Sequence, residues 1–109
     1  MKLKVKFNVR RTRTLITNYY ANYNIINDSK VDEDTYFIVV EKFYFRNSSR
    51  ASLSIVISQI DEENCIIEAV GSGGGKGMLF SFDWGAKQSF ENEITGILSS
   101  NQIHFETIS

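Results

Sequence analysis

Apolar and polar residues alternate along the first part of the chain, from residue 2 to residue 10. Leucine, valine and phenylalanine occupy every second position, and lysine, asparagine and arginine fill the positions between them. A period of two with β-branched and aromatic side chains predicts a half-buried strand over residues 2–10. Its outward side carries Lys2, Lys4 and Lys6, so we expect that face to be basic.

The spacing of apolar residues lengthens to a helical period after residue 12. Between Thr12 and Tyr23 the apolar and aromatic residues recur three and four positions apart, which places them on one face of a helix. These residues are Leu15, Ile16, Tyr19, Tyr20 and Tyr23. Residues 24–34 are rich in asparagine and acids, so we expect a polar connection there.

Three strands are predicted next, over residues 36–46, 51–60 and 65–70. The first is apolar on both faces and should therefore lie in the centre of the sheet. The second alternates apolar residues with serine, and an acidic turn over residues 61–64 joins it to the third. A glycine-rich connection leads to a further predicted strand over residues 78–83. Connections this short favour antiparallel neighbours.

A second amphipathic helix is expected after Trp84, and residues 103–106 alternate weakly, as a short final strand would. The apolar face of the helix consists of Ala86, Phe90, Ile94, Ile97 and Leu98. The predicted order is β-α-β-β-β-β-α, in one α+β domain over residues 1–109. We expect a single, mainly antiparallel sheet of about five strands with two helices on one face, as in a helix-grip or TATA-binding-protein-like fold.

Composition narrows the range of functions. The 109 residues are 42% hydrophobic with a formal net charge of −1, so the chain can bury a core without disulfides or metals. One cysteine, Cys65, excludes a disulfide within the chain, and with one histidine, His104, it excludes the usual zinc sets. No cofactor is indicated. No apolar run reaches the length of a membrane span and no signal-peptide pattern is present, so we expect a cytoplasmic protein.

The chain shows no pattern typical of a catalytic centre. Cys65 lies beside isoleucines in a predicted strand, where a buried and unreactive thiol is the ordinary outcome. No local motif joins His104 to a nucleophile. The acids of residues 61–63 have the pattern of a solvated turn. We therefore expect no enzymatic activity.

Residues 71–77 hold five of the seven glycines of the chain and invite comparison with phosphate-binding loops. Counting back from Lys76, Val70 stands where a Walker loop needs its first glycine, and Gly77 replaces the hydroxyl residue. The dinucleotide fingerprint also fails, because Lys76 stands at its third glycine. Two interpretations stay open: a nest of backbone amides for an anion, and a flexible or bulged hairpin in which glycine supplies positive φ.

Basic residues flank this loop and its neighbour. The connections 47–50 and 71–77 fall at the same end of a meander, with their strands about 10 Å apart. Their cations and the glycine amides could form a cradle for a phosphate or carboxylate. Alternatively, the arginines pair with Glu41, Glu68 or Asp83. The candidate anion- or ligand-binding residues are Arg46, Arg50, Gly73, Gly74, Gly75 and Lys76.

We expect a non-catalytic module that binds a small ligand or a protein partner through a groove under the last helix or an exposed sheet edge. The alternative is a binder of nucleic acid or an anionic surface. That alternative rests on six cations, Lys2, Lys4, Lys6, Arg10, Arg11 and Arg13. Lysines on an outer strand face also protect against edge-to-edge aggregation. The open edges of a small sheet further predict a symmetric homodimer.

Several segments together resemble a family of small uncharacterised bacterial proteins, typical of Gram-positive species. The resemblance covers roughly residues 36–98 and implies no activity, cofactor or catalytic residue. The segments that carry it are Glu41–Arg46, Ser49–Leu53, Gly71–Gly75 and Phe82–Ala86.

Overall fold

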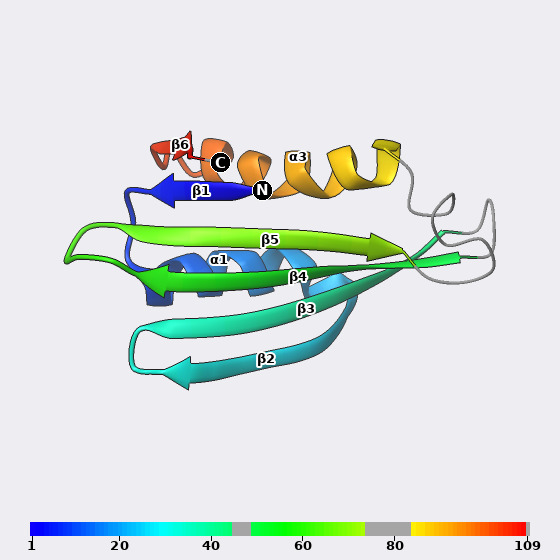
Figure 1. Ribbon diagram of the computed structural model, residues 1–109, viewed down its shortest axis with the longest axis horizontal. Coiled ribbons are helices and arrows are strands. Elements are labelled where there is room, and N and C mark those ends of the chain that lie inside the picture. Colours follow the sequence, from blue (N-terminus) through cyan, green and yellow to red (C-terminus); the bar gives the residue numbers. More distant parts are fainter. Residues whose placement is uncertain (45–48, 74–83, 109) are drawn as a thin grey trace.

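A computed structural model of the protein describes residues 1–44, 49–73 and 84–108. Within these residues the chain forms an α+β domain with a single antiparallel sheet of six strands. Its two α-helices lie on one face of the sheet, where α1 packs against β3 and β4 and α3 against β5 (Figure 1). The α+β class, the two helices and the antiparallel sheet are therefore confirmed.

The elements follow one another in a simple order. They are β1 (Lys2–Val5), α1 (Val9–Tyr19), the 3₁₀ turn η1 (Tyr20–Asn22), β2 (Asn24–Asp32), β3 (Thr35–Tyr44), β4 (Ser49–Gln59), β5 (Cys65–Gly73), α3 (Trp84–Ser100) and β6 (Phe105–Thr107). In the sheet the strands are arranged β2-β3-β4-β5-β1-β6. The first strand is thus inserted between β5 and the last strand.

The expected strands are corrected in two places. Residues 24–34 were expected to form a polar connection, but β2 pairs with β3 along most of that stretch. Its side chains are largely exposed, because an edge strand is held by backbone hydrogen bonds and does not need an apolar face. Strand β6 lies where the weak alternation of residues 103–106 suggested a short final strand, but the predicted order omitted it, so about five strands become six within the described residues. The strand predicted over residues 78–83 lies outside them.

The first strand is shorter than its alternating pattern predicts. It ends at Val5, and α1 begins at Val9 instead of near residue 12. Asn8 is the reason, because its side-chain oxygen accepts hydrogen bonds from the amides of Arg10 at 2.9 Å and Arg11 at 3.2 Å. This is a helix N-cap. Arg10 therefore belongs to the helix and not to a basic strand face.

Because Asn8 caps α1, its substitution should lower the stability of the protein even though the residue is exposed. Asn8→Ala is expected to lower the free energy of unfolding by about 1 kcal/mol, because two helix amides lose their acceptor. Asn8→Asp keeps an acceptor and is expected to retain nearly full stability. Urea unfolding followed by circular dichroism measures both variants. Equal losses in the two variants would contradict the assigned cap.

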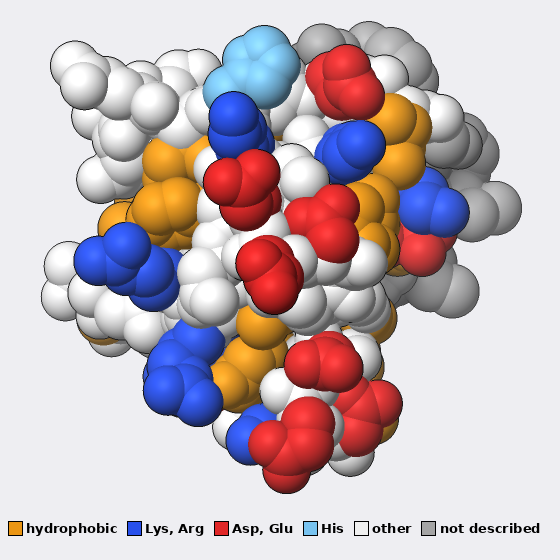
Figure 2. Space-filling view, turned by 90° about the vertical axis from the view of Figure 1, so that its left-hand side faces the viewer, with side chains coloured by type: hydrophobic (Ala, Val, Ile, Leu, Met, Phe, Trp, Pro, Cys, Tyr) orange, Lys and Arg blue, Asp and Glu red, His pale blue; other side chains and the backbone are white. Residues whose placement is uncertain are grey.

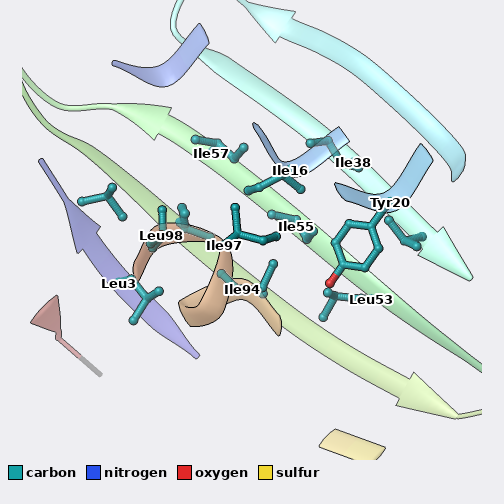
Figure 3. Packing of buried hydrophobic residues seen from close by; sticks show 14 of the residues in the cluster. Leu3, Ile16, Tyr20, Ile38, Leu53, Ile55, Ile57, Ile94, Ile97 and Leu98 are labelled. Carbon is teal, nitrogen blue, oxygen red and sulfur yellow. The ribbon is translucent and has the colours of Figure 1, made fainter. Parts of the chain in front are cut away.

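The core lies between the sheet and the helices. The inward side chains of β4 alternate as predicted, and those of β3 and β5 point inward in the same way. Four members of the predicted helical face of α3, Phe90, Ile94, Ile97 and Leu98, pack onto them. Figure 3 shows these side chains interlocking, with Ile94, Ile97 and Leu98 directed toward the sheet. The space beneath this part of α3 is consequently filled by the core, so a binding groove has to lie elsewhere.

Candidate functional site

A groove runs between α1 and α3 on the outer side of the helical layer. Its volume is about 870 Å³, which falls in the range of small-molecule sites. One wall comes from α1 and the other from α3 and the residue that follows it. The lining residues are Leu15, Asn18, Tyr19, Ser89, Asn92, Glu93, Gly96, Ile97, Ser100 and Asn101.

The groove combines an apolar floor with open amides. Ile97 is only 5% exposed, and half-buried Leu15 packs against the same core. The side chains of Asn18 and Asn92 are exposed and form no hydrogen bond with another described residue. Each amide offers two donors and one acceptor. A molecule in the groove would therefore meet an apolar surface flanked by free hydrogen-bonding groups.

Gly96 lies in the α3 wall and widens the groove. A Cβ atom added at this position would meet nothing within 4 Å. Glycine inside a helix costs about 1 kcal/mol relative to alanine, and close packing does not require it here. The missing side chain thus leaves open space in the wall at a cost in helix stability.

A buried ion pair anchors the other part of this wall. The carboxylate of Glu93 pairs with the ammonium group of Lys42, and their side chains are only 15% and 12% exposed. The Tyr20 hydroxyl donates to Oε1 of Glu93 at 3.0 Å. The Lys42 ammonium also lies 4.6 Å from the ring centre of Tyr23 and 5.1 Å from that of Phe90. Every polar group of the cluster is therefore engaged.

The protonation of the neighbouring tyrosines follows from this arrangement. Burial raises the pKa of Tyr20 far above its ordinary value, and the negative charge of Glu93 raises it further. Burial and Glu93 also raise the pKa of Tyr19. Both hydroxyls consequently remain protonated around neutral pH, and that of Tyr20 donates its hydrogen bond to the carboxylate.

The sequence analysis missed this cluster, although a signal was present. Lys42 follows Ile38 and Val40 in the inward phase of β3, where a charged residue needs a partner. Glu93 stands three residues after Phe90 and four before Ile97, on the buried side of α3. Of the three tyrosines expected on the apolar helical face, Tyr20 is fully buried, whereas Tyr19 and Tyr23 are 42% and 44% exposed.

The predicted anion site is described only in part. Arg50 begins the outward face of β4 opposite Phe43, and Gly73 ends β5 opposite Ala51, so both lie at one end of the sheet. Arg50 lies 3.4 Å from the carboxylate of Glu41, which is one of the pairings considered as the alternative. The remaining candidates, Arg46, Gly74, Gly75 and Lys76, lie outside the described residues, and the anion site stays a prediction.

The basic residues near the start of the chain are interleaved with acids. Lys2 lies opposite Glu68 on β5, and Lys4 lies opposite Glu106 on β6. Arg13 forms an ion pair with Asp28. Figure 2 shows the same mixture at the end of the molecule that carries the hairpin turns, where acidic side chains gather beside basic ones. Binding of nucleic acid through this region stays a prediction, and the mixture of charges does not support it further.

Other candidate chemistry is limited in the described part of the chain. No group of three histidine, cysteine or acidic side chains is placed to hold a metal ion there. Cys65 is fully buried as expected, and burial raises the pKa of its thiol. None of the described helices is long and apolar enough to cross a membrane.

Comparison with known proteins yields one match. The sequence model of a family described as a family of unknown function (DUF6054) matches residues 8–102. No curated protein matches the chain, and no solved structure matches it either. The expected resemblance to a family without assigned activity is consistent with this result.

Proposed function

The chain belongs to this family of unknown function, and we propose that it is a non-catalytic binding module whose ligand occupies the groove between α1 and α3. The observation that carries the proposal is the open volume of about 870 Å³. Apolar side chains line its floor, and hydrogen-bonding groups stand at its rim. Such a combination is typical of small-molecule sites.

The charges of the groove indicate the kind of ligand. Among the described residues that line the groove, Glu93 is the one carboxylate, and Lys42 and Tyr20 already engage it. The free groups are neutral amides and hydroxyls. The groove therefore suits an uncharged molecule with an apolar body and a few polar groups. A carboxylate tied to a buried cation is also a poor general base, which supports a binding role over catalysis.

Several finer expectations from the sequence form part of this proposal. These are the helix-grip or TATA-binding-protein-like fold, a bacterial source and a cytoplasmic location. Binding of nucleic acid by the basic N-terminal residues is the second candidate. Measuring the affinity at several salt concentrations distinguishes the two candidate functions. Affinity that depends on phosphate contacts falls steeply with ionic strength, whereas affinity for an uncharged ligand in the groove changes little.

Gly96→Leu provides the direct test of the groove. A fragment library screened by amide chemical shifts should give hits that shift Asn18, Asn92 and Gly96 together. Leucine at position 96 projects into the open space, so we expect binding of these hits to weaken at least tenfold. The variant should be no less stable than the wild type, because leucine favours a helix over glycine by about 0.8 kcal/mol.

Gly96→Ala is the matched control for this experiment. It restores helix propensity but adds a single methyl group, so it should raise the melting temperature and leave binding nearly unchanged. Hits that shift residues away from the two helices would contradict the proposal. So would hits that bind the leucine variant as tightly as the wild type.

A further inference from the structure

The sheet face opposite the helices carries an apolar patch at its centre. The patch consists of outward side chains from three adjacent strands, and we call it the central patch. Its members are Phe37, Val39, Val56, Ile66 and Val70. Phe37 pairs directly with Val56, and Ser54 lies between Val39 and Val70. Val56 is 37% and Val70 61% exposed, and no described element covers them.

Charged residues of both signs lie around and beside the central patch. Among the described paired residues, three cations and four carboxylates lie on the same face, which are Lys2, Lys4, Arg50, Asp32, Glu41, Glu68 and Glu106; Glu68 lies directly opposite Val56. An apolar centre with a polar rim is the usual anatomy of a protein interface. Because the described residues of this face carry both signs in nearly equal numbers, opposite charges of two copies can pair with each other. Each copy therefore presents both positive and negative side chains to its partner.

The sheet edges, which the sequence suggested for self-association, are poorly suited to it. The edge strand β2 has two register irregularities, between Ile25 and Asn27 and between Lys30 and Asp32. Bulges and charged residues of this kind prevent edge-to-edge pairing. The opposite edge strand, β6, has only three residues. Self-association through the open face is therefore favoured over the edges.

The face is large enough for a stable contact. Strands β3 and β4 have 10 and 11 residues, which corresponds to a length of about 33 Å. Four strands side by side span about 19 Å, so β2 to β5 alone present about 600 Å². Strands β1 and β6, with four and three residues, add about 110 Å². The total of about 700 Å² lies within the range of standard interfaces, about 600–1,000 Å² per partner.

We propose that a second copy of the chain covers this face, with the two sheets stacked and the central patch of each copy packed on that of the other. The result is a symmetric dimer with four layers, helices outside and sheets inside. In this arrangement both α1–α3 grooves stay open to solvent. The inference does not depend on the occupant of the groove.

Sedimentation equilibrium tests the proposal at chain concentrations from about 1 to about 200 μM, which cover dissociation constants in the micromolar range. The wild type should behave as twice the chain mass of 12.5 kDa. Val56→Lys places a charge at the centre of the patch and should weaken the dimer at least a hundredfold. Val31→Lys is the control, because Val31 is 62% exposed on the edge strand β2. Circular dichroism confirms that both variants are folded.

A distance measurement distinguishes the face from the edge independently. Cys65 is buried, so a spin label can be directed to Ser54→Cys on the open face. Stacked sheets lie about 10 Å apart, and the two labels should then be within about 20 Å of each other. A wild type that is monomeric at every concentration would overturn the proposal. Dissociation by Val31→Lys but not by Val56→Lys would overturn it as well.

Discussion

Glu93→Ala is expected to lower the free energy of unfolding by about 3–5 kcal/mol, because it leaves the ammonium group of Lys42 buried without a counter-ion. The Lys42 side chain is only 12% exposed, and among the described residues Glu93 is the one acid with which it forms an ion pair. The hydroxyl of Tyr20 loses its acceptor in the same substitution. Urea unfolding at neutral pH measures the loss.

Two further variants show whether the predicted loss of stability arises because the charge of Lys42 is buried. The double variant Lys42→Met with Glu93→Leu removes both charges and should be considerably more stable than Glu93→Ala, since no unpaired charge remains. Arg50→Ala breaks a pair whose arginine side chain is 66% exposed, and it should cost less than about 1 kcal/mol. If Glu93→Ala cost no more than Arg50→Ala, the buried pair would not have the stabilising role assigned to it.

The periodicity of the chain predicted those elements whose side chains are sorted by burial. Along β4 the inward residues Leu53, Ile55 and Ile57 are each at most 2% exposed, whereas outward Val56 is 37% exposed. The apolar face of α3 was identified for the same reason. Strand β2 escaped prediction because neither of its faces is buried, and its structure depends on backbone pairing with β3.

The candidate site could not be derived in the same way. The Lys42–Glu93 pair joins residues 51 positions apart, and its formation depends on how α3 is rotated over the sheet. The groove requires the relative placement of two helices that the sequence specifies only one at a time. Local composition drew attention to the glycine-rich segment instead, since five glycines form a conspicuous pattern without any tertiary information.

The docking of α3 on the sheet sets both the stability of the domain and the shape of the groove. Ile94 is fully buried in the core beneath the groove wall (Figure 3). Ile94→Ala is expected to lower the free energy of unfolding by about 2–5 kcal/mol, through lost burial and the cavity left behind. Denaturant unfolding gives the value.

The graded variant Ile94→Val should cost about 0.5–1.5 kcal/mol, because it removes a single methylene. Ser99→Ala lies on the exposed side of the same helix and should change stability by less than about 0.5 kcal/mol. Below its melting temperature, Ile94→Ala should still bind groove ligands, since Ile94 does not line the groove. A loss no larger than that of Ser99→Ala would mean that α3 is not anchored through this face. The groove between the helices would then lack the fixed wall on which specific binding depends.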